Sequence, residues 1–159
     1  MLYDYQYTVT GGVHCFQFSA VSLKLTLTPS SLIINDWAKG LDVLCIDLVR
    51  PGDKLYFDAG ETICHILKDF INNNKHTALS YYPGFTDNKD ISRLKLFDAW
   101  ISKFIETDEI LKYSIRLYFP GSNNSREMLA LQVFMHNAFP KKRELLNELT
   151  SFSDKLGGQ

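Results

Sequence analysis

A β-hairpin at the start of the chain is the feature that most constrains the fold. Between residues 2 and 10, large apolar side chains occupy every second position, which is the pattern of a strand with one apolar face. Gly11 and Gly12 follow and supply the positive φ angles that a two-residue hairpin turn requires. A slip of one residue would mix the two faces, so the register is well specified. The predicted pairs are Val9 with His14, Tyr7 with Phe16, Tyr5 with Phe18, and Tyr3 with Ala20.

The remaining segments predict further strands and three helices. Period-two patterns and short apolar runs predict strands at 23–28, 43–49, 77–82, 113–119 and 127–136. Apolar residues at helical spacing predict helices at 59–72, at 91–106 and from Pro140 onward. Hairpins near both ends imply an α+β two-layer sandwich, a mostly antiparallel sheet with its helices on one face. We expect Tyr3, Tyr5 and Tyr7 to lie in its core rather than on a dimer face.

Length, charge and cysteine content narrow the class of protein. The 159 residues predict a single α+β domain at 1–152, followed by a flexible tail at 153–159. A net charge of −1 argues against a duplex nucleic-acid binder, which needs a clustered basic surface. Three widely spaced cysteines indicate free thiols in a reducing compartment. Without a signal-peptide pattern or a long apolar stretch, we expect a cytoplasmic protein with no membrane contact.

The segment 77–105 contains the first candidate site. It reads as a strand, a polar loop and an aromatic helix, and a loop between rigid elements is a common place for binding chemistry. In the functional interpretation, Arg93 clamps an anionic group of a polar or phosphorylated ligand, and Asp87 or His136 transfers a proton. In the structural alternative, Asp90 caps the helix and its polar neighbours are solvated turn residues. The candidate ligand-binding residues are Tyr82, Asp87, Lys89, Arg93 and His136.

A second candidate is an anion site at the start of the last helix. Lys141, Lys142 and Arg143 stand together beside amide groups that have no partner within the helix. This arrangement would suit a phosphate or a nucleic-acid backbone. The alternative is an ordinary solvated helix end with Glu144 nearby.

Motifs for other chemistry are missing from the sequence. It has no G-x-S-x-G elbow, no phosphate loop and no pair of histidines at metal-ligating spacing. We therefore expect no catalytic residue, no cofactor and no metal, and whether the protein is an enzyme stays open.

The segment LSYYPGFTDNKDISRLKLFDAWISKF resembles a signature in a family of short, uncharacterised bacterial proteins. In that family a strand ending in an aromatic residue leads to an Asp-x-Lys loop, an Arg and a Leu-Phe-x-x-Trp helix. The resemblance extends over nearly the whole chain and implies a shared fold unit without a known activity. An insertion-like Pro83-Gly84-Phe85 departs from the pattern. The matching positions are Tyr82, Asp87, Lys89, Arg93, Leu96, Phe97 and Trp100.

These observations favour a small cytosolic binding module whose partner is another protein or a second copy of the chain. Aromatic residues make up 13% of the sequence, and the first hairpin can leave an edge strand for a partner. The alternative is an enzyme or ligand-binding domain that recognises a phosphorylated small molecule or nucleic acid through residues 87–93. A third possibility is single-stranded nucleic acid bound by exposed rings beside residues 141–143.

Overall fold

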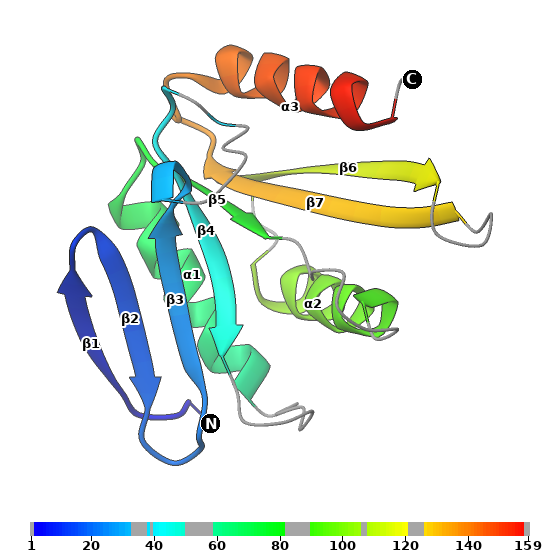
Figure 1. Cartoon of the computed structure of the whole chain (residues 1–159). Helices are drawn as coiled ribbons and strands as arrows, with labels where there is room; N and C mark the ends of the chain where they lie inside the picture. Colours follow the sequence, from blue (N-terminus) through cyan, green and yellow to red (C-terminus); the bar gives the residue numbers. More distant parts are fainter. Residues whose placement is uncertain are drawn as a thin grey trace.

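The computed structural model describes residues 2–32, 38, 40–49, 59–81, 90–105, 108–120 and 126–157. The structure describes only the backbone of residues 90–95, 104, 116–120, 126–130 and 153–157. Within these ranges a seven-stranded sheet and three α-helices form the fold (Figure 1). The strands are β1 (Tyr5–Thr10), β2 (Val13–Phe18), β3 (Lys24–Pro29), β4 (Val43–Val49), β5 (Ala78–Tyr81), β6 (Ile110–Pro120) and β7 (Arg126–His136). The helices are α1 (Gly60–Asn73), α2 (Asp90–Phe104) and α3 (Lys142–Gly157), and a 3-10 turn, η1, spans Ser30–Leu32.

The sheet is mixed and mostly antiparallel, which confirms the predicted α+β class. Its strand order is β1-β2-β3-β4-β5-β7-β6. Strands β4 and β5 are parallel, and every other neighbouring pair is antiparallel. The parallel pair arises because α1 lies between β4 and β5 in the chain and carries it back to the same end of the sheet.

The first hairpin has the register that the sequence predicted. Tyr5 pairs with Phe18, Tyr7 with Phe16 and Val9 with His14. Gly11 and Gly12 have φ angles of 60° and 80°, as a two-residue turn requires. The fourth predicted pair lies beyond the strand ends, because β1 begins at Tyr5 and the preceding Tyr3 donates its N–H to Thr62 Oγ1 of α1 at 2.8 Å.

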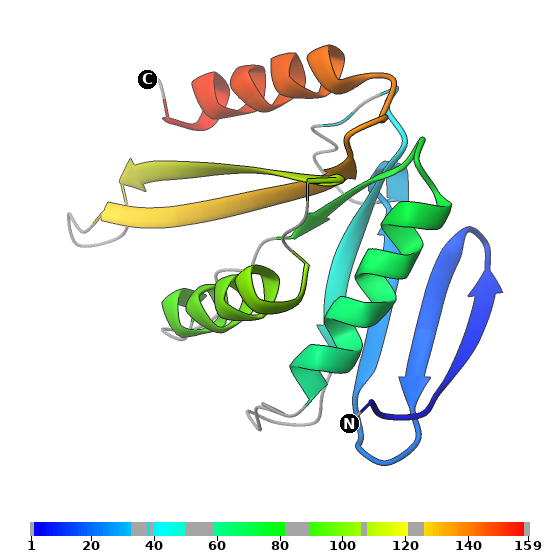
Figure 2. The same cartoon turned by 180° about the vertical axis from the view of Figure 1, so that it is seen from behind.

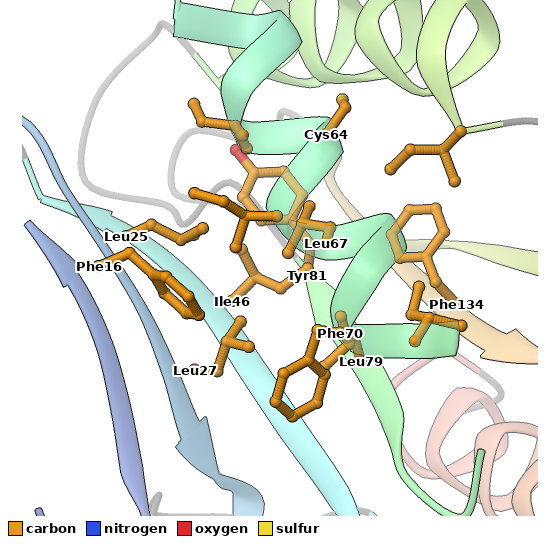
Figure 3. Packing of buried hydrophobic residues seen from close by; sticks show 14 of the residues in the cluster. Phe16, Leu25, Leu27, Ile46, Cys64, Leu67, Phe70, Leu79, Tyr81 and Phe134 are labelled. Carbon is orange, nitrogen blue, oxygen red and sulfur yellow. The ribbon is translucent and has the colours of Figure 1, made fainter. Parts of the chain in front are cut away.

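A first hydrophobic core joins α1 and α2 to one face of the sheet. Leu25 and Leu27 of β3 and Ile46 of β4 point toward Leu67 of α1 (Figure 3). The predicted apolar stripe of α1 is buried in this core, as is Phe97 of α2. Because side chains alternate along a strand, the residues between these point to the opposite face.

Helix α3 lies on that opposite face, so the predicted placement of all helices on one face is wrong. Leu145 and Leu149 of α3 pack in a second core with Val133 and Met135 of β7, whereas the intervening Phe134 belongs to the first core. Figure 1 accordingly shows α3 and α2 on the two sides of β6 and β7. The described fold therefore has two layers where α1 packs on the sheet and three layers where β6 and β7 lie between α2 and α3. Helix α3 also continues to Gly157, into the predicted tail at 153–159.

Candidate functional site

The structure describes only part of the site predicted near the polar loop. Tyr82, Asp87 and Lys89 lie outside the described residues, and Arg93 is described only as a backbone position in the first turn of α2. His136 is buried at the end of β7, with 8% of its surface exposed. The combination of the loop residues with His136 therefore stays a prediction.

The His136 ring has a local structural role. Its Nδ1 accepts the backbone N–H of Ala138 at 3.0 Å, so the hydrogen of the neutral ring is on Nε2. This bond closes the turn between β7 and α3. In the same turn, Phe139 donates its N–H to the His136 carbonyl at 2.9 Å, and Asn137 donates its N–H to the carbonyl of Glu109 at 2.7 Å. The imidazole thus helps to direct the chain from the sheet into α3.

The predicted anion site at residues 141–143 has one of its three cations engaged. Lys142 begins α3, and its Nζ donates to the carbonyl of Asn137 at 2.6 Å. Lys141 and Arg143 are exposed on either side of it. Arg93 stands on α2, which packs against the other face of the sheet. The two predicted groups of cations therefore lie on helices that cover different faces.

A groove between the first hairpin and α1 is the most distinctive surface of the described residues. Figure 2 shows α1 crossing the middle strands, with β1 to one side of it. As a result Tyr5, Tyr7 and Val9 are 37%, 50% and 52% exposed. The prediction that Tyr5 and Tyr7 lie in the core is wrong, because α1 does not extend over β1. Tyr3, which is bonded to Thr62, is half-buried against the first core, as predicted.

Aromatic rings form a continuous layer from β1 to α1. The ring of Tyr7 stacks on Phe16 at 4.7 Å and 14°. Its hydroxyl shares a 2.6 Å hydrogen bond with Nδ1 of His14, and the His14 ring meets Phe70 of α1 edge to face at 5.0 Å. Tyr5 contacts Phe16 in the same way at 5.6 Å. The exposed tyrosines are therefore held in place by rings beneath and beside them, which makes this surface preorganised.

Polar groups of α1 form the other wall of the groove. Asp69, Asn73 and Asn74 line it beside the rings and Ile66. The Asp69 side chain is 60% exposed, and its Oδ2 lies 3.3 Å from Nε2 of His65. The groove has a volume of about 220 Å³. That is less than the roughly 300 to 1,000 Å³ of small-molecule sites, and larger than the roughly 150 Å³ that holds benzene, so it suits one side chain.

The backbone edge of β1 is open alongside this groove. Ser19 donates its N–H to the Asp4 carbonyl, and Phe18 donates its N–H away from β1, to Leu23. Hydrogen-bonded and non-bonded pairs alternate in an antiparallel ladder, so Gln6, Thr8 and Thr10 bond to β2. The outward N–H and C=O groups of β1 belong to the other residues of the strand, namely Tyr5, Tyr7 and Val9. Of these, Tyr5 and Tyr7 also line the groove.

Nothing in the sequence of β1 blocks pairing at this edge. Its six residues, YQYTVT, contain no charge and no proline, and it pairs with β2 without a bulge. Natural sheets usually protect an edge strand with charged residues, a proline or a β-bulge. Within the described part of the chain, β1 is the first strand of the sheet, and no strand pairs with its outer side.

The thiol of Cys64 belongs to the first core. Burial raises the pKa of the Cys64 thiol from 9.0 to about 12, so this group stays neutral and packs as a small apolar side chain. Among the described residues, no three His, Cys, Asp or Glu side chains lie close enough together to hold a metal ion. None of the helices in the described ranges has the length and apolar character needed to span a membrane.

Comparison with protein-family models, with curated protein sequences and with solved structures finds no match to this chain. The resemblance to short bacterial proteins through residues 82–100 therefore stays a prediction. The assignment of a function rests on the geometry of the molecule itself.

Proposed function

We propose that this protein is a binding module that receives an extended segment of a partner protein as an additional strand along β1. The observation that carries the proposal is the coincidence of two features at Tyr5 and Tyr7. Their backbone hydrogen-bonding groups point outward, as do those of Val9, and the side chains of the two tyrosines line the aromatic groove. The backbone of an added strand would form hydrogen bonds with these outward groups, and its side chains would be recognised by the groove.

The dimensions of the site support an extended peptide over a compact small molecule. The open edge extends along a strand of six residues, whereas the groove beside it holds about 220 Å³. Each backbone hydrogen bond that a partner makes contributes about 1 kcal/mol, so several in a row give useful affinity without any one dominant contact. Rigid tyrosine rings add contact area at a low entropic cost.

The location we propose for this module is the cytoplasm. Cys15, Cys45 and Cys64 are thiols rather than disulfides in the structure, which suits a reducing compartment.

The alternative function, recognition of a phosphorylated ligand, has support from fewer described groups. Lys141 and Arg143 are exposed at the start of α3, but Lys142 between them donates to the Asn137 carbonyl. Both β1 features, by contrast, involve described residues whose geometry is specified by the hairpin register. The β1 edge is therefore the site to test first.

A pair of variants at Val9 tests the proposal. The probe is a phage-displayed library of random linear peptides, selected on the folded chain, from which the tightest binders are synthesised. Val9→Pro and Val9→Ala both remove the valine side chain, but only proline also removes the outward N–H. Because that N–H does not bond to β2, proline is compatible with the edge of the hairpin. Circular dichroism and thermal unfolding check that both variants fold.

We expect Val9→Pro to weaken peptide binding about tenfold relative to Val9→Ala, since it removes one hydrogen bond and places a ring in the path of the partner strand. Equal affinities of the two variants would contradict strand addition at β1. Sedimentation equilibrium of the unliganded chain adds a second criterion. A dimer that Val9→Pro dissociates would assign the edge to a second copy of the chain and overturn the peptide proposal.

A further inference from the structure

We infer that the groove beside β1 binds the side chain of a lysine or arginine from the added strand. This inference rests on the proposed function and specifies what the partner must contain. The partner is therefore a segment in extended conformation with a basic residue on the side that faces α1.

The geometry of strand addition brings such a side chain to the groove. Neighbouring strands lie about 4.8 Å apart, and alternate side chains of an added strand project on the same face as Tyr5 and Tyr7. A lysine or arginine beside Tyr7 has a long aliphatic stem that can lie across the tyrosine ring. Its charged end then reaches the space between the hairpin and α1, where Asp69 lines the wall.

The charges around the groove favour a cation. Among the described residues that line the groove, Asp69 is the only acidic one, and none is lysine or arginine. Its carboxylate is 60% exposed, and its neighbour at 3.3 Å is His65. The side-chain amides of Asn73 and Asn74 stand at the same wall. A lysine or arginine side chain would bring a permanent positive charge to a wall whose described lining residues include neither of these residue types.

The aromatic layer favours a cation for a second reason. The half-exposed ring of Tyr7 is fixed by its stack on Phe16 and by its hydrogen bond to His14. The face of an aromatic ring carries partial negative charge and attracts ammonium and guanidinium groups within about 6 Å. A carboxylate and a fixed ring on the same small groove therefore act on the same side chain.

Charge complementarity favours a foreign partner over a second copy of the chain. If β1 of another molecule occupied the edge, it would present the residues of its own α1-facing side, namely Tyr5, Tyr7 and Val9. None of these is basic, so a second copy would bring no lysine or arginine to Asp69. A segment containing lysine or arginine satisfies both the backbone edge and the groove.

The test compares matched peptides on matched variants. A selected peptide is synthesised with its basic residue and with a neutral replacement, norleucine for lysine or citrulline for arginine. Both are measured by calorimetry on the natural chain, on Asp69→Asn and on Asp47→Asn. Asp47 is an exposed carboxylate of β4 on the other face of the sheet from the groove, so it controls for a change in net charge alone.

On the natural chain we expect the neutral replacement to weaken binding about tenfold, and on Asp69→Asn only about threefold. Asp47→Asn should behave as the natural chain does. The inference is overturned if the neutral peptide binds the natural chain as tightly as the basic one, or if Asp47→Asn has the same effect as Asp69→Asn. Comparison of Val9→Pro with Val9→Ala distinguishes failure of the basic-residue inference from failure of strand addition itself. If that pair differs as expected while the neutral replacement has no effect, only the basic-residue inference fails. If that pair does not differ, strand addition fails and the inference falls with it.

Discussion

Replacing Gly60 with alanine tests how closely α1 and α2 pack. Gly60 is the first residue of α1 and is buried against Trp100 of α2. A methyl group at this position would overlap the indole Nε1 and Cε2 atoms and lie 2.5 Å from Cδ1. Comfortable contacts between carbon atoms are about 3.5 to 4.0 Å, so the two helices must separate by about 1 Å or the indole must rotate.

Two opposing effects determine the sign of the change in stability. Alanine is favoured over glycine inside a helix by up to about 1 kcal/mol, and by less at the first position. Overpacking of a close contact costs about 1–3 kcal/mol, and rotation of Trp100 would also disturb its edge-to-face contact with Phe97 at 6.5 Å. We therefore expect Gly60→Ala to lower the free energy of unfolding by about 1–2 kcal/mol. For a chain of this size the melting temperature should fall by about 3–6 °C.

A double-mutant cycle identifies the indole as the cause. Urea unfolding followed by circular dichroism is measured for Gly60→Ala, for Trp100→Leu and for the double variant. In the Trp100→Leu background the indole is gone, so Gly60→Ala should be neutral or slightly stabilising. This corresponds to a coupling energy of at least about 1 kcal/mol. A stabilising Gly60→Ala in the natural chain, or the same change in both backgrounds, would refute the reasoning.

Two further predictions concern the two cores. Because folded Cys64 keeps its proton up to a pH of about 12 whereas a free thiol loses it near 9.0, the unfolded state deprotonates first as the pH rises above 9. The free energy of unfolding should therefore fall more steeply between pH 9 and 11 in the natural chain than in Cys64→Ala, and equal slopes in urea titrations would count against a buried thiol. In the second core, Leu149→Ala should cost about 2–5 kcal/mol, because Leu149 is 3% exposed on the side of α3 that meets the sheet. A loss below about 1 kcal/mol in the same titration would contradict this docking of α3.

The hairpin register could be predicted from sequence because local chemistry specifies it. Gly11 and Gly12 specify the turn, and the alternation of rings and polar residues specifies the face. The same period-two pattern correctly identified β3, where Leu25 and Leu27 are fully buried. These features depend on residues close together in the chain, so no knowledge of the helices was needed.

The positions of the helices could not be predicted in the same way. Whether α1 extends over β1 depends on how strands separated by many residues assemble, so the exposure of Tyr7 could not be deduced from its own neighbours. For α3 there was a usable signal, since Val133, Phe134 and Met135 are consecutive apolar residues of β7. A strand with this pattern is buried on both faces and needs a helix on each. At the polar loop, residues 82–89 lie outside the described part of the chain, so the first candidate site stays a prediction.

Amide hydrogen exchange of the chain with a selected peptide bound is the most direct test of strand addition at β1. In the free protein, the amides of Gln6, Thr8 and Thr10 should exchange slowly because they bond to β2, and those of Tyr7 and Val9 should exchange quickly because they face outward. Saturation with the peptide should slow exchange at Tyr7 and Val9 and leave the β2-bonded set unchanged. Continued fast exchange at Tyr7 and Val9 in the saturated complex would contradict the account.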